Sequence, residues 1–140
     1  MAQMFNPPDV WSPFGAFSMG VVQGNGQIVY LKGQVALNQN GQVVGRQNMK
    51  AQVRKVLENI QTVLDYIGGR MGDIVSLTQY VTDIDAFMEA GAVRQEFFTP
   101  PFPVTTTVEV SRLYHLDLLV EITAIAEIPK DRFRRPPGDS

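Results

Sequence analysis

One long amphipathic helix constrains this chain more than any other feature of its sequence. Apolar side chains recur at spacings of three and four residues from Val53 to Ile67, so they form one stripe with charged residues on the opposite face. Asn48 is a suitable N-cap before this stripe, and Gly68-Gly69 ends it as a glycine C-cap. Such a helix must bury its stripe against another layer, which predicts a layered domain.

Shorter patterns predict the remaining elements. A second helix is expected from an apolar stripe that begins at Phe87 and ends at Phe98, with Asp83 and Asp85 before it and Pro100 after it. β-Branched and alternating residues predict strands over 17–22, 27–31, 35–44 (a short hairpin), 74–82, 104–110 and 118–128. The predicted order is β-β-β-α-β-α-β-β.

Two Asn-Gly dipeptides, at 25–26 and 40–41, predict tight turns. They favour a meander for the N-terminal strands. Gly24-Asn25-Gly26 neither opens a helix nor carries a suitably placed lysine, so we interpret it as a turn and not as a phosphate-binding loop.

Two helices with one stripe each can cover only one face of a mixed sheet, which predicts an α+β fold with an open sheet face. Alternation in the last strand directs Val120 and Ile122 toward the helices. It directs toward the open face Leu119, Glu121, Ile125 and Glu127. We expect the threonines of 104–110 that alternate with its valines, at 105 and 107, on this open face as well. Such a face is either solvated or buried against another subunit, and its apolar residues favour the subunit.

Composition narrows the function classes. The 140 residues, 44% of them hydrophobic, predict one domain over 1–128 and a flexible tail over 129–140. A net charge of −2 favours neither nucleic acid nor a membrane surface as partner. No cysteine is present, residues 1–13 do not resemble a signal peptide, and no stretch is long enough to span a membrane, so a cytoplasmic protein is expected.

Isolated polar residues give no metal or catalytic site by themselves. His115 is the only histidine and falls in a predicted turn, where a surface role is the simpler interpretation. Asp83, Asp85 and Glu89 are better explained as the acidic first turn of a helix than as metal ligands. No metal and no cofactor are expected.

Several segments together resemble the Rid (YjgF-type) superfamily of reactive-intermediate deaminases. They are Tyr30 to Val35, the helix with Gln52, Leu57 and Asn59-Ile60, Gly69 to Ile84, and Phe102-Pro103 through Arg112-Leu113 to Glu121–Ala126. The resemblance implies a chorismate-mutase-like homotrimer whose open sheet faces pack together and whose ligand pockets lie between neighbours. It also implies cofactor-free hydrolysis of reactive enamines or imines, such as 2-aminoacrylate, to a keto acid and ammonia.

The resemblance also assigns candidate site residues. Phe17 matches an aromatic residue of the family pocket, Gly33 the glycine whose backbone lines it, and Glu121 the glutamate that positions water. Lys32 stands where the family has a serine. These residues are therefore expected at a pocket that binds a small metabolite, with Glu121 as its catalytic group.

Position 105 departs from the family pattern. The deaminating members carry an arginine two residues after the Phe-Pro proline, where this chain has Thr105, and often a cysteine where it has Thr107. A guanidinium pairs with a carboxylate through two charge-assisted hydrogen bonds, and a threonine offers one neutral bond. This difference corresponds to about ten- to a hundredfold in affinity for a small imino acid.

Two residues near this motif need separate interpretation. Arg112 matches a second family arginine and is expected to be structural. Lys32 or an arginine of 132–135 would be the candidates to replace the missing cation.

Two functions remain open from the sequence. The first is a deaminase-type hydrolase whose substrate is larger or less anionic than 2-aminoacrylate, with Glu121 as acid or base and Thr105 or Thr107 orienting the substrate. The second is a non-catalytic trimer that binds a small metabolite or another protein in the same cleft.

Overall fold

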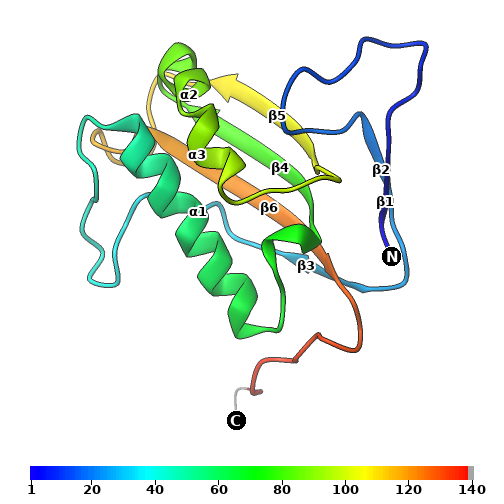
Figure 1. Ribbon diagram of the computed structural model, residues 1–140. Coiled ribbons are helices and arrows are strands. Elements are labelled where there is room, and N and C mark those ends of the chain that lie inside the picture. Colours follow the sequence, from blue (N-terminus) through cyan, green and yellow to red (C-terminus); the bar gives the residue numbers. More distant parts are fainter. Residues whose placement is uncertain (139–140) are drawn as a thin grey trace.

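A four-stranded mixed sheet forms the centre of the structure, a computed structural model that describes residues 1–138 (Figure 1). The strand order is β3 (Gln27–Tyr30), β6 (Val120–Ile128), β4 (Ile74–Val81) and β5 (Val104–Glu109). Only β4 and β5 are parallel, and β6 runs antiparallel to both of its neighbours. The parallel strand β5 therefore forms one edge of this sheet.

The helices all lie on one face of the sheet, as the sequence predicted (Figure 1). They are α1 (Met49–Tyr66), the 3₁₀ turn η1 (Met71–Asp73), α2 (Ile84–Glu89) and α3 (Gly91–Gln95). The stripe of α1 is buried against β6, except that Val63 is exposed. Asn48 caps α1 by accepting a hydrogen bond from the Ala51 amide at 3.0 Å, and Gly68 ends it with a positive φ of 81°.

The second predicted helix is divided at Ala90, which ends α2 and precedes α3. Gly91 follows directly, and glycine is a poor helix former because its backbone loses more entropy on folding. The apolar stripe is still buried, since Phe87 and Val93 both belong to the core.

The predicted N-terminal meander is wrong. β2 (Gly20–Val22) pairs with β1 (Gln3–Phe5), a strand that the sequence did not predict, and β3 pairs with β6. The turn at 25–26 does not close a hairpin because the amides of Gly24 and Gly26 donate instead to the Glu127 carboxylate, at 2.7 and 3.2 Å.

Two further expectations are modified by these contacts. Glu127, predicted on the open face, is buried beneath the loop that donates to it. The predicted 35–44 hairpin is reduced to a single bridge between Leu37 and Val43 around the turn at Gly41.

The first part of the predicted tail packs against the domain. Arg132 donates to both oxygens of Asp73, at 2.7 and 2.9 Å, and to the carbonyl of Gly68 at 3.0 Å. The hydrogen bonds to Asp73 raise the pKa of Arg132 above its ordinary value. The Arg134 amide continues the contact by donating to Ile67. The last two residues of the predicted tail, 139–140, lie outside the described residues.

The substitution Arg132→Ala should lower the free energy of unfolding by about 2 kcal/mol, because it removes charge-assisted hydrogen bonds from a carboxylate that is only 9% exposed. Arg46→Ala is the control, since Arg46 forms an exposed ion pair with Asp117 and such pairs contribute about 0–1 kcal/mol. Urea denaturation measures both. An equal loss of unfolding free energy in the two variants would show that the contact of Arg132 with Asp73 does not anchor the tail.

Candidate functional site

Thr105 and Thr107 face the helices, which corrects the prediction that they lie on the open face. In the β4–β5 ladder Thr105 pairs with Leu77 and Thr107 with Gln79. Residues paired across a ladder point to the same side, and both β4 partners are buried on the helix-covered side. Alternation therefore predicted which residues of β5 share a face, but only the pairing decides which face that is.

Glu121 lies on the opposite, open face of the sheet. Its partner in the ladder is Tyr80, and the chain of Gly33 crosses beside it. A Cβ at position 33 would overlap the Glu121 carboxylate and stand 3.0 Å from the Thr123 hydroxyl oxygen. A glycine at this position thus leaves the space that the carboxylate occupies, and the structure brings these two predicted site residues together.

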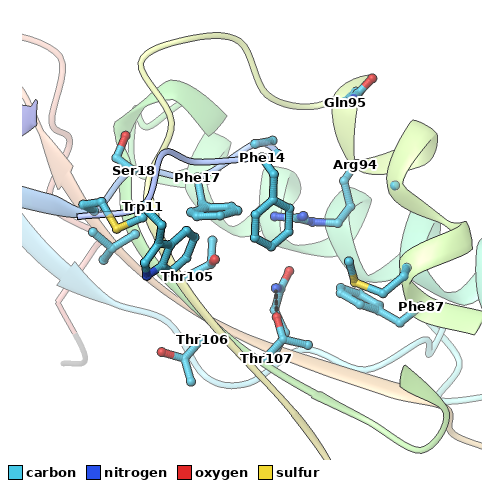
Figure 2. A pocket seen from close by; sticks show the side chains of 17 residues that line it. Trp11, Phe14, Phe17, Ser18, Phe87, Arg94, Gln95, Thr105, Thr106 and Thr107 are labelled. Atoms are coloured by element: carbon cyan, nitrogen blue, oxygen red, sulfur yellow. Dashed lines mark hydrogen bonds between the residues drawn. The ribbon is translucent and has the colours of Figure 1, made fainter. Parts of the chain in front are cut away.

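A cavity of about 740 Å³ lies on the other side of the sheet, at its β5 edge. The N-terminal segment forms one wall and is held there by a hydrogen bond from the Ser18 amide to the Pro103 carbonyl, at 2.9 Å. Three aromatic rings of this wall pack together, those of Trp11, Phe14 and Phe17, with centroids 5.2–5.8 Å apart (Figure 2). The Trp11 and Phe14 rings are stacked, and the Phe17 ring meets both of them edge-on. Of the predicted site residues, Phe17 joins Thr105 and Thr107 in this cavity.

The polar groups of the cavity come from β4 and β5. Gln79, only 1% exposed, donates from Nε2 to the Thr107 hydroxyl at 2.8 Å. Its Oε1 is buried and accepts no hydrogen bond from the part of the chain that the structure describes. The wall therefore holds a fixed amide and two threonine side chains beside the aromatic rings.

Arg94 reaches from α3 into the same cavity, toward Phe17 and Phe14 (Figure 2). Its guanidinium carbon lies 5.9 Å from the centre of the Phe87 ring. Nε and Nη2 are buried and find no acceptor within residues 1–138. Burial lowers the pKa of Arg94 below its ordinary value. This cation is partly removed from water, and no carboxylate among residues 1–138 pairs with it.

Sequence reasoning missed Arg94, Trp11 and Phe14. A signal for Arg94 was present, because it follows Phe87 by seven residues and so shares the face of the predicted helical stripe. A basic residue within an otherwise apolar stripe indicates either a partner or a ligand. The aromatic residues carried no comparable periodic signal.

The other expected cations lie elsewhere. Lys32 is exposed and lines a separate hollow of about 960 Å³ beside α1, together with Gly33. Arg132 is engaged with Asp73, and Arg134 donates to the Asp65 carbonyl at 2.8 Å.

The isolated polar residues have local structural contacts. Arg112 donates to the neighbouring Leu113 carbonyl at 3.1 Å. His115 accepts from the Asp117 amide within its turn, and Asp83 caps α2 by accepting from the Ala86 amide at 3.0 Å. Over residues 1–138 no three histidine or acidic side chains are grouped closely enough to hold a metal ion, and no helix there is long and apolar enough to cross a membrane.

Comparison with known proteins gives a consistent family. Residues 9–128 match the family described as Endoribonuclease L-PSP. A RutC family protein of Saccharolobus solfataricus is 39% identical over 116 residues, which is 82% of this chain and 89% of that protein. The 2-iminobutanoate/2-iminopropanoate deaminase of Escherichia coli is 35% identical over 116 residues, 80% of this chain and 87% of the relative.

A solved structure agrees with this assignment. The crystal structure of YyfB from Yersinia pestis, described as a protein of unknown function of the conserved Rid protein family, superposes with a TM-score of 0.78. It is 32% identical and the match covers 91% of this chain and 98% of YyfB.

Proposed function

The chain belongs to the Endoribonuclease L-PSP family of RutC and Rid proteins, and we propose that it is a cofactor-free hydrolase that deaminates a reactive enamine or imine. The relative named as an imine deaminase supports this reaction. Water adds to the imine carbon, the carbon–nitrogen bond breaks, and a ketone and ammonia are released. The observation that carries the proposal is that Phe17, Thr105 and Thr107 line one and the same cavity.

Glu121 is the proposed acid–base group. A carboxylate can orient the attacking water, accept its proton and return a proton to the departing nitrogen. Because Glu121 and the two threonines lie on opposite faces of one sheet, they cannot act together within one chain. They can meet only if a second copy brings its Glu121 to the cavity at the β5 edge.

A homotrimer is the proposed assembly. The open face carries Tyr30, which is 77% exposed, and the half-buried Ile125, so it offers apolar area to another subunit. Each cavity would then be completed by its neighbour, which fits the split arrangement of the candidate residues.

The substrate is proposed to be larger than 2-aminoacrylate. The cavity of about 740 Å³ is in the range of sites for drug-sized ligands, and aromatic rings form one wall. The family description also contains the word endoribonuclease. An RNA substrate requires several phosphate-neutralising cations, which a net charge of −2 does not favour.

A non-catalytic binding module is the second candidate, and Thr105 favours it. The cavity is formed with a threonine at position 105, where the deaminating relatives are expected to place a guanidinium. Such a trimer would bind a metabolite without releasing ammonia.

Turnover of a graded series of imines separates the two candidates. An amino-acid oxidase can generate the imines of leucine, phenylalanine and alanine in place, and ammonia release is followed with and without the protein. We expect acceleration for the leucine and phenylalanine imines and little for the alanine imine.

Light scattering measures the proposed assembly and should give about three times the chain mass of 15.6 kDa. A trimer that accelerates none of the three would support the binding module, and a monomer would contradict the shared site.

A further inference from the structure

We propose that Arg94 is the anion-binding residue of the β5-edge cavity, and that this cavity takes a carboxylate attached to an apolar body. That the bound molecule is then hydrolysed rests on the proposed function. That a carboxylate binds is argued from the contacts of the cavity alone. The resemblance to the deaminating members placed the carboxylate-binding cation at position 105 on β5. In this proposal the cation is instead on α3, at another wall of the same cavity.

The first reason is the unsatisfied guanidinium. Arginine has five N–H donors and remains charged in proteins, so a partly desolvated guanidinium needs acceptors. Nε and Nη2 of Arg94 have none within residues 1–138, and the Phe87 ring compensates only part of the lost hydration. The missing acceptors must come from outside the part of the chain that the structure describes.

The second reason is the geometry of the donors. Nε and one Nη of a guanidinium form a planar fork that matches the two oxygens of a carboxylate. Arg94 leaves that pair of donors free, because its buried atoms without a partner within residues 1–138 are Nε and Nη2. A carboxylate bound to this fork would satisfy both atoms with two charge-assisted bonds.

The third reason is the charge of the cavity. Within one subunit, Arg94 is the only ionisable side chain among the lining residues that the structure describes. One positive charge balances a monoanion, whereas a phosphate dianion would leave an excess negative charge in a partly apolar site. Thr105 and Thr107 can add neutral hydrogen bonds beside the fork.

The aromatic wall indicates what the carboxylate is attached to. Trp11, Phe14 and Phe17 form the aromatic wall, and Met88 and Val104 add to the apolar lining of the cavity. A branched aliphatic or aromatic body would bury its surface there, and each buried CH₂ contributes to affinity. Acetate, with only one methyl group, would gain almost none of this contribution.

Trp11 provides a binding signal that does not depend on turnover, since it is the only tryptophan of the chain and lines the cavity. The probes are 4-methylpentanoate and its uncharged amide, 4-methylpentanamide, followed by tryptophan fluorescence. We expect the acid to bind the unaltered protein more tightly than the amide, and more tightly than acetate or inorganic phosphate.

Three variants test the role of the guanidinium. Arg94→Leu should weaken binding of the acid by about ten- to a hundredfold and leave the amide unchanged. Arg94→Lys keeps the charge but loses the fork, so it should lie between the two. Arg46→Leu is the control, because it removes an exposed arginine that does not line the cavity, and it should bind the acid normally.

A rescue variant separates recognition from a structural role. In the Arg94→Leu background, Thr105→Arg returns a guanidinium to the opposite wall of the same cavity and should recover part of the affinity for the acid but not alter the amide. Arg94→Leu should also melt no lower than the unaltered protein, because it replaces an unpaired, partly buried charge by an apolar side chain.

Three results would overturn the proposal. The first is no saturable binding of 4-methylpentanoate to the unaltered protein, and the second is equal binding by Arg94→Leu. The third is binding that appears only with Glu121→Gln, which would mean that a neighbouring glutamate already neutralises Arg94.

Two further outcomes separate this proposal from the proposed function. If the acid binds in an Arg94-dependent way but no imine is hydrolysed, the carboxylate site stands and the deaminase function fails. If imines are hydrolysed equally well by Arg94→Leu, the deaminase function stands and the role of Arg94 fails.

Discussion

Replacing Gln52 by leucine is expected to lower the free energy of unfolding by about 3–4 kcal/mol, although leucine is a good helix former. Gln52 is fully buried on α1, and its side chain serves three backbone groups. Nε2 donates to the carbonyls of Gly45 and Asp117 at 3.2 and 2.8 Å, and Oε1 accepts from the Leu119 amide at 2.8 Å. Leucine would leave all three groups without these partners, two of them just before β6.

The matched control is Gln61→Leu, the same exchange at an exposed position of the same helix. It should change the free energy of unfolding by less than about 0.5 kcal/mol. Urea denaturation followed by circular dichroism measures both variants. A Gln52→Leu protein as stable as the control would show that water replaces the side chain in these contacts.

Glu121→Gln is expected to reduce imine turnover by about a hundredfold or more and leave the assembly intact. Glutamine has nearly the same shape, so it fits the space left by Gly33, but it cannot exchange a proton. The control is Glu58→Gln, which removes an exposed carboxylate of α1. Rates are compared with the light-scattering mass of each variant, and an unchanged rate for Glu121→Gln would remove this residue from the proposed chemistry.

Periodic patterns predicted the elements whose contacts are local. The stripe of α1 and the alternation of β6 were read correctly because burial follows a fixed period along each element, and Val120 and Ile122 are buried as expected. The N-terminal strands were assigned to the wrong partners because strand pairing over long distances is not encoded in local periodicity. The amide of Gly24, in the expected turn, donates instead to the carboxylate of Glu127, which lies 103 residues further along the chain.

The site was harder to predict than the fold for a related reason. The alternation of β5 was correct, but its phase depends on the β4 register, which placed Thr105 on the helix side. The replacement cation was sought at Lys32 and in the tail, where arginines are conspicuous in the sequence. Arg94 was hidden within an apolar stripe, and only the arrangement of α3 and the N-terminal segment around one cavity shows that it enters the cavity.

Subunit complementation tests most directly whether the catalytic site is shared between two copies of the chain. Glu121→Gln and Arg94→Leu chains are unfolded, mixed in equal amounts and refolded, and imine hydrolysis is measured at low substrate concentration. Each variant alone should be nearly inactive. The mixture should recover about a quarter of the unaltered rate, because about half of the cavities keep Arg94 and about half of those receive Glu121 from a neighbour. A mixture proven to contain hybrid trimers but no more active than its parents would contradict a site that is completed across the interface.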